Sequence, residues 1–310
     1  MTARLLSALS VLGLFALPAC TGDLPVPQIV LTPRVLAIVA DQPEAHPGDD
    51  VQVRAFMFDP MGRELRYEWR ACVSLEALLG SNSIPSGLPE EPCFPIESDG
   101  DRATVPGERT QEVVDQLTAL GNIGGFEVAY LVLVLNTAGF AFTVEVDVYA
   151  GDELLASAFK RVGITTRDAL TTNPDPIAYD VGGTLVAMHR PGLGESGFDG
   201  SHFDCIVWGA PVVVAPESET VFSPLGDPAD WIETFPVFDF SGGITPGTEN
   251  AYYSFYATAG AISTETTRLP DRDVTFTAPI EPGPVQMFLA VRDGHLGARI
   301  CTFEIEVAAP

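Results

Sequence analysis

The chain has 310 residues, and its 42 Asp and Glu against 16 Lys and Arg give a formal net charge of −26. This balance excludes electrostatic binding to nucleic acid, because affinity for phosphates needs clustered basic side chains. Apolar residues make up 46% of the chain, enough to bury sizeable cores. The 29 glycines and 26 prolines favour many short strands over long helices, and the length suggests about two domains.

The N-terminus has the layout of an export signal. Arg4 precedes an uncharged apolar stretch, residues 5–17, which is too short for a helix across the roughly 30 Å hydrocarbon core of a bilayer. The next residues, Leu17-Pro18-Ala19-Cys20, resemble the lipobox of bacterial lipoproteins. The resemblance implies a signal peptide over residues 1–19 and lipidation of Cys20 as the new N-terminus. An ordinary secretory signal that ends near a cysteine is the alternative.

Lipidation of Cys20 would anchor the protein to a membrane through several acyl chains, which hold stably where one chain is marginal. The prolines within residues 20–33 then predict a short, stiff tether between the bilayer and the first domain. Thr21 is not the aspartate that retains enterobacterial lipoproteins at the inner membrane. The expected location is therefore the bacterial cell envelope, at the outer membrane.

The first half of the mature chain predicts an all-β domain over residues 34–166. Apolar alternation predicts strands at 35–40, 51–58, 65–69, 103–105, 127–135, 140–149 and 154–162, and a helical segment at 108–120. The remainder of 73–109 reads as a long excursion. Trp69 alternates with Leu65 and Tyr67 against charged neighbours, so we expect it to be a core anchor and not a ligand platform.

A second all-β domain is expected over residues 179–310. The prolines of Asn173-Pro174-Asp175-Pro176 disfavour regular structure and place a linker at 167–178, which should let the two domains unfold separately. Strands are expected at 184–189, 203–208, 211–215, 251–258, 273–277, 285–292 and 298–307, with a loop at 216–248 that covers an aromatic-rich strand. The closing hairpins of the two halves look alike, which suggests an internal duplication.

These patterns carry a resemblance. Pro47-Gly48, an alternating strand, Asp59-Pro60-Met61-Gly62 and then residues 65–69 resemble the first half of an immunoglobulin-like or PKD-like β-sandwich. Residues 252–256 and 289–294 resemble the matching strand and last hairpin in the second half. With the lipobox in front, the chain is similar to two-domain surface lipoproteins common in myxobacteria. The resemblance implies two immunoglobulin-like sandwiches in tandem after a lipoprotein signal peptide, and it supplies no catalytic residues.

Four cysteines remain once Cys20 is lipidated. In an exported protein they are expected to form disulfides, and four cysteines allow three connectivities. The domain boundary disfavours the two connectivities that cross it. We therefore expect Cys72 to pair with Cys93 and Cys205 to pair with Cys301.

Sequence patterns typical of catalysis or metal binding are missing. The histidines (His46, His189, His202 and His295) are scattered and no Cys-x-x-Cys occurs, which argues against zinc. Calcium could use the acid pairs Asp99 and Asp101, Asp227 and Asp230, or Asp271 and Asp273, but solvated acidic loops explain these pairs better. We expect no catalytic residues, no metal and no cofactor.

The sequence thus favours a non-enzymatic, membrane-anchored surface lipoprotein that presents two immunoglobulin-like domains for binding or spacing. Its partner is an unknown protein or glycan, and nucleic acid is excluded. Two alternatives stay open. One is a subunit of a larger envelope assembly that docks by strand addition, and the other is a glycan-acting envelope enzyme that uses paired carboxylates.

Overall fold

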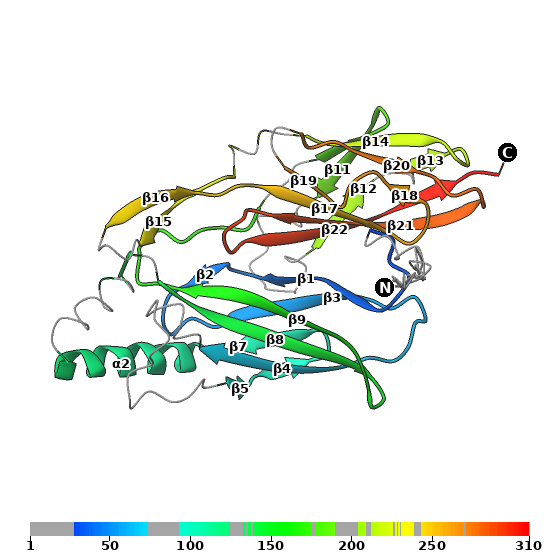
Figure 1. Cartoon of the computed structure of the whole chain (residues 1–310). Helices are drawn as coiled ribbons and strands as arrows, with labels where there is room; N and C mark the ends of the chain where they lie inside the picture. The colour runs from blue at the N-terminus through cyan, green and yellow to red at the C-terminus, as the bar shows by residue number, and fades with distance from the viewer. Residues whose placement is uncertain are drawn as a thin grey trace, which may run out of the picture.

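The computed structural model describes residues 28–73, 93–124, 133, 136–137, 139–174, 178–189, 204–208, 212–225, 227, 229, 231–238, 243–268 and 271–309. These residues form two β-sandwiches that lie one on the other (Figure 1). The predicted signal peptide at 1–19 and Cys20 lie outside the described residues.

The first sandwich comprises β1 (Arg34–Ala40), β2 (Glu44–Ala45), β3 (Val51–Phe58), β4 (Arg66–Val73), β5 (Cys93–Pro95), β6 (Glu97–Asp99), β7 (Arg102–Val105), α2 (Gly107–Gly124), β8 (Phe140–Ala150) and β9 (Glu153–Ile164). One sheet has the order β1-β3-β7-β6 and the other the order β2-β9-β8-β4-β5. In immunoglobulin-like sandwiches one sheet contains strands A, B, E and D, and the other contains C, F and G. Taken in chain order, β1, β3, β6 and β7 occupy the places of A, B, D and E, and β4, β8 and β9 occupy the places of C, F and G. The short strand β2 pairs in parallel with β9 at one edge.

Alternation positions the first core as predicted. Val51, Val53 and Ala55 on β3 are buried while their neighbours are partly exposed. Trp69 on β4 is 5% exposed and lies within the same cluster, opposite Val146 of β8. Its indole Nε1 donates a hydrogen bond to the Gly100 carbonyl oxygen at 3.1 Å, which satisfies the polar end of the buried ring. The expectation that Trp69 anchors the core is confirmed.

Two expectations for the first domain are wrong. The strand expected at 127–135 contains Leu133, which is helical, and the Thr137 hydroxyl donates to the Leu133 carbonyl oxygen at 2.6 Å, the i to i−4 contact of a helix. The rest of that range, apart from Leu133, lies outside the described residues. The excursion after β4 contains the short strands β5 and β6, which pair at the edges of the two sheets.

The second sandwich comprises β10 (Ala178–Val181), β11 (Thr184–His189), β12 (Asp204–Trp208), β13 (Val212–Val214), β14 (Glu219–Leu225), β15 (Thr234–Phe238), β16 (Ile244–Thr248), β17 (Tyr252–Ala257), β18 (Ala261–Ile262), β19 (Thr266–Arg268), β20 (Val274–Thr277), β21 (Gly283–Arg292) and β22 (Ala298–Val307). In spatial order the run β10-β14-β20-β18 matches β1-β3-β7-β6, and β22-β21-β17-β19 matches β9-β8-β4-β5. The hairpins β8–β9 and β21–β22 therefore occupy equivalent places. Unlike in the first sandwich, β11 and β12 join the two runs into one continuous sheet, and β18 precedes β19 in the chain whereas β5 precedes β6. The range 216–248, expected as a loop, contains β14 and the separate hairpin β15–β16.

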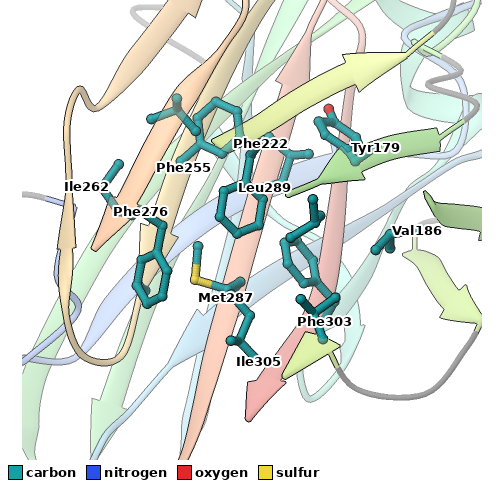
Figure 2. Close-up of a cluster of buried hydrophobic side chains, with 14 of the residues drawn as sticks. Tyr179, Val186, Phe222, Phe255, Ile262, Phe276, Met287, Leu289, Phe303 and Ile305 are labelled. Atoms are coloured by element: carbon teal, nitrogen blue, oxygen red, sulfur yellow. The ribbon is translucent and has the colours of Figure 1, made fainter. Parts of the chain in front are cut away.

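The core of the second sandwich is rich in aromatic rings (Figure 2). The ring of Phe222 on β14 lies 6.1 Å from that of Phe276 and 5.7 Å from that of Phe303, measured between centroids. Met287 and Leu289 of β21 fill the space beside them. Tyr253 and Phe255 of β17 belong to the same core, so these members of the aromatic segment are packing residues.

A third hydrophobic cluster joins the two sandwiches. β1 is buried on both faces, since Ile38 and Ala40 belong to the first core while Leu36 and Val39 face the second sandwich. The partner residues lie on β17, β21 and β22, and Phe58 of β3 meets Phe288 edge to face at a centroid distance of 5.3 Å. The cluster contains Val30, Leu36, Ala37, Val39, Tyr256, Phe288, Ala290, Ala298 and Ile300, with Phe56 and Phe58 against it. This cluster leads us to predict that the two sandwiches unfold together, against the expectation that the linker lets them unfold separately.

The segment before β1 is also attached. The Val30 amide donates to the Ala257 carbonyl oxygen at 2.8 Å, and the Ala257 amide donates to the Gln28 carbonyl oxygen at 2.9 Å. Val30 is 3% exposed within the joining cluster. Residues 28–30, expected in the tether, therefore extend the second sandwich beside the end of β17, and any tether ends by Gln28.

Candidate functional site

A cleft of about 1250 Å³ lies between the two sandwiches. Its walls come from β1 and β9 of the first sandwich and from β17, β19 and the β21–β22 turn of the second. Among the described residues, four basic side chains line it against three acidic ones, although acids far outnumber bases in the chain. The cleft thus concentrates positive charge in a strongly acidic protein. The basic residues are Lys160, Arg161, Arg268 and Arg292, and the acids are Asp271, Asp273 and Asp293.

Tyr252 holds two of these cations. The guanidinium carbon of Arg268 lies 5.4 Å from the centroid of the Tyr252 ring, and that of Arg292 lies 5.7 Å from it. The face of the ring attracts the positive charge of a guanidinium and does not use the N–H donors that lie in the guanidinium plane. Cation–π contact therefore positions Arg268 while leaving its donors free for another partner.

Arg292 also connects the two walls. It donates from Nη1 to the Ser254 hydroxyl at 3.2 Å and from Nη2 to the Leu36 carbonyl oxygen on β1 at 3.3 Å. The second bond crosses from the second sandwich to the first. Arg292 thus helps to hold the cleft at a defined width.

Lys160 on β9 is the only lysine of the chain. Its Nζ donates to the Leu296 carbonyl oxygen in the β21–β22 turn of the other sandwich. Burial lowers the pKa of Lys160 to about 8, although the nearby carboxylate of Asp293 opposes that shift. The ammonium remains largely protonated at pH 7, so Lys160 adds a positive charge to the cleft wall.

A buried carboxylate, that of Glu44, lies where the first sandwich, the linker and the second sandwich meet. Glu44 on β2 is 1% exposed; its Oε2 accepts hydrogen bonds from Arg167 Nη2 and from the Thr171 amide at 2.9 Å. Its Oε1 lies 3.6 Å from Nε2 of His295, an electrostatic contact beyond hydrogen-bond distance. Burial alone would raise the pKa of Glu44, but the contacts with His295, Thr171 and Arg167 outweigh burial and lower it. Glu44 is therefore a charged link between the sandwiches.

Two further carboxyl groups are buried with contacts that do not outweigh burial. Glu249 is 4% exposed; Oε2 accepts from the Glu233 amide at 2.9 Å, while Oε1 has no hydrogen-bond partner among the described residues. Burial raises the pKa of Glu249 to about 8, and the negative charges of Asp293, Glu233 and Glu44 act in the same direction. Burial likewise raises the pKa of Asp293, whose Oδ2 faces Gly297 so closely that a Cβ there would collide with it.

Asn173 in the predicted linker is bonded to both sandwiches. Asn173 Nδ2 donates to the Ala40 carbonyl oxygen at 2.8 Å, and its Oδ1 accepts from the Ala298 amide at 3.0 Å. One side chain therefore bonds β1 of the first sandwich and β22 of the second. Residues 175–177 lie outside the described part of the chain.

The cysteines predicted to pair lie on neighbouring strands. Cys72 and Cys93 form a disulfide between opposed positions of β4 and β5, with their Cα atoms 4.0 Å apart. Cys301 on β22 is disulfide-bonded, and Cys205 on β12 is the residue opposite it in the parallel pairing of these strands. The pairing of Cys205 with Cys301 stays a prediction.

The acidic pairs considered for calcium are dispersed. Asp101 pairs with Arg54, Oδ2 to Nε, at 2.6 Å, and Asp271 and Asp273 are exposed on the cleft. Asp230 and His202 lie outside the described residues. Within the part of the chain that the structure describes, no three His, Cys, Asp or Glu residues are grouped as metal ligands. In the same residues, no helix has the length and apolar character needed to cross a membrane.

Sequence reasoning missed the cleft residues, because each wall is contributed by a different half of the chain. The unusual scarcity of lysine marked Lys160 but gave it no role. Arg268 and Tyr252 lie on adjacent antiparallel strands as opposed residues, which only the register of β17 and β19 reveals. Predicting a strand at 266–268 and its pairing with residues 252–254 would have placed Arg268 opposite Tyr252.

Comparison with known proteins finds no matching family model and no matching curated protein. Among solved structures, the chain is similar to the D0-D1 domain of intimin, with 12% identity over 89% of this chain and 99% of that one, at a TM-score of 0.20. It is also similar to the chicken CNTN1 FN1-FN3 domains, with 8% identity over 90% of this chain and 66% of that one, at a TM-score of 0.21. The fold assignment rests on strand order and not on these low scores. By that order, the chain contains two immunoglobulin-like β-sandwiches in tandem.

Proposed function

We propose that the protein is a non-enzymatic, lipid-anchored surface protein of a bacterial envelope that presents its two sandwiches as one binding unit. The observation that carries a binding role is the cleft between the sandwiches, where basic side chains from both halves converge. A protein that served only as a spacer would not need this concentration of charge. The lipobox at Leu17-Pro18-Ala19-Cys20 supports the anchor and the likeness to myxobacterial surface lipoproteins.

The anchor has a direct test. Mass spectrometry of the protein from native envelopes should find an acylated Cys20 and no preceding residue. Cys20→Ser should release the protein from the membrane fraction, while Cys72→Ser, which breaks the disulfide with Cys93 and leaves Cys20 intact, should leave it there. An unmodified N-terminus at another residue would contradict the lipoprotein assignment.

A second candidate is a subunit of a larger envelope assembly. The hairpin β15–β16 forms a sheet of its own and exposes apolar side chains, with Val237 39% and Ile244 46% exposed. Such side chains on a hairpin are suited to contact another protein. Recovery of a stoichiometric partner from detergent-solubilised envelopes, lost in Ile244→Asp, would favour this candidate. Release of shorter products from a polysaccharide would instead favour the enzyme alternative.

A further inference from the structure

The cleft carries more information than the presence of a binding site, because its lining specifies the charge of the ligand. Arg161 on β9 and Arg268 on β19 stand on opposite walls, and both are exposed. Neither has an ion pair or a hydrogen bond from its guanidinium among the described residues. Elsewhere arginines are paired, as in Arg70 with Glu145 at 2.6 Å and Arg54 with Asp101 at 2.6 Å. In a chain of net charge −26, two unpaired arginines on facing walls are an exception.

The free donors suit a carboxylate. A guanidinium offers a planar fork of N–H groups that matches the two oxygens of a carboxylate, and such charge-assisted bonds are strong. Arg268 is held by the Tyr252 ring in a contact that leaves the fork free.

The rest of the lining suits a sugar. Phe159 lies two residues before Arg161, on the same face of β9, and 71% of its surface is exposed although it is a large apolar side chain. An exposed aromatic ring offers a flat face on which the C–H face of a pyranose can pack. Thr264 and Thr266 line the opposite wall; their hydroxyl groups bond the Thr266 carbonyl oxygen and the Ser254 hydroxyl, and each retains capacity to accept a hydrogen bond. At about 1250 Å³ the cleft is large enough for several sugar rings.

We propose that the cleft binds a carboxylate-bearing oligosaccharide, with Arg161 and Arg268 holding uronate groups from opposite walls and Phe159 packing against a sugar ring. This inference names the ligand class of the binding role proposed above and rests on that role. An acidic peptide shares the charge but has no need of the exposed ring. Two aspartates, Asp271 and Asp273, are exposed on the cleft and would repel anions of high charge density. They would favour an oligosaccharide that carries one carboxylate on each sugar ring.

The test uses the mature chain from residue 21, so that its outcome does not depend on lipidation. Isothermal titration calorimetry compares tetragalacturonate, its methyl ester, which has the same rings without charge, and tetraglutamate. Tetragalacturonate should bind, its methyl ester should bind at least about tenfold more weakly, and raising salt from about 50 to about 500 mM should weaken binding.

Variants locate the site. Arg161→Gln and Arg268→Gln should each weaken tetragalacturonate binding about tenfold, and Phe159→Ala should weaken it while leaving the salt dependence unchanged. Arg109→Gln on α2 is the matched control, because it removes the same charge far from the cleft and should have no effect. Equal affinity for the acid and the ester, preference for tetraglutamate, or binding insensitive to both arginine variants would overturn the proposed ligand class. If the ester or the peptide binds and Phe159→Ala abolishes that binding, the cleft keeps its proposed binding role with a different ligand. If none of the three ligands binds, the inference is overturned.

Discussion

Trp69 illustrates how one residue fixes the first core. Its ring fills space between the sheets and its Nε1 is hydrogen-bonded to Gly100. Trp69→Ala should lower the free energy of unfolding by about 3 to 5 kcal/mol, because it leaves a cavity and an unpaired carbonyl group. Urea denaturation followed by circular dichroism measures the change. Trp69→Phe should cost less, since it keeps most of the ring, and a loss below about 1 kcal/mol in Trp69→Ala would contradict this packing.

Glu249 predicts a dependence of stability on pH. Its pKa is raised from 4.5 to about 8 in the folded protein. Between these values the folded state holds a proton that the unfolded state has lost, so the contribution of Glu249 to stability falls as pH rises from 4.5 to about 8. Glu249→Gln cannot ionise and keeps an oxygen that can accept from the Glu233 amide. The stability of this variant relative to the natural protein should increase over that pH range.

Thermal melts at several pH values check this expectation. Glu219→Gln is the matched control for removal of one carboxyl group, because Glu219 is exposed on β14. A difference between Glu249→Gln and the natural protein that stays constant from pH 5 to pH 8 would show that Glu249 does not titrate in this range.

At the scale of elements, the disulfide fixes the edge strand β5 to β4. It joins residues 21 apart in the sequence. The chain-entropy model assigns about 3 kcal/mol to closing a loop of this length. The double variant Cys72→Ala, Cys93→Ala should therefore lose about that much free energy of unfolding in chemical denaturation. An unchanged denaturation midpoint would mean that the strand pairing alone holds β5 in place.

Strands with one buried face could be predicted from the sequence, and strands with other surroundings could not. β3 has the expected bounds because polar residues alternate with Val51, Val53 and Ala55 along most of the strand. Buried and exposed residues alternate along β14 too, but Pro224 and the neighbouring turn-forming residues led the sequence analysis to expect a loop there. The strand expected at 127–135 is contradicted at Leu133, the one described residue of that range, because a run of apolar and β-branched residues has no period that separates helix from strand.

The candidate site could be predicted only in part for a related reason. The sequence marked Tyr252 as one of several aromatic residues and Lys160 as the sole lysine. It could not place Arg161 opposite Arg268, since these residues belong to different sandwiches. Their approach depends on how the sandwiches pack, which no local pattern encodes.

At the scale of the whole molecule, the hydrophobic cluster between the two sandwiches is the feature that favours one cooperative unit over two independent domains. A signal for it exists in hindsight, because β1 and part of β21 are continuous apolar runs, which is typical of strands buried on both faces. Those runs were consistent with ordinary core strands, so the sequence alone favoured separate domains.

Phe288 tests the joint without entering either core. It packs on Phe58 across the interface. Phe288→Ala should lower the stability of both sandwiches together, by about 3 to 5 kcal/mol if the cavity does not collapse. Phe159→Ala removes an equally large ring that is 71% exposed and should have little effect. Hydrogen exchange that increased only in β21 and β22 after Phe288→Ala would contradict a shared core.

The central claim is that the two sandwiches form a single unit that holds the cleft between them. Differential scanning calorimetry of the mature chain from residue 21 tests it most directly. A shared core, with Asn173 hydrogen-bonded to both sandwiches and Glu44 in electrostatic contact with His295, predicts one transition whose calorimetric and van't Hoff enthalpies agree. Two resolved transitions, each with the enthalpy of one sandwich, would contradict it.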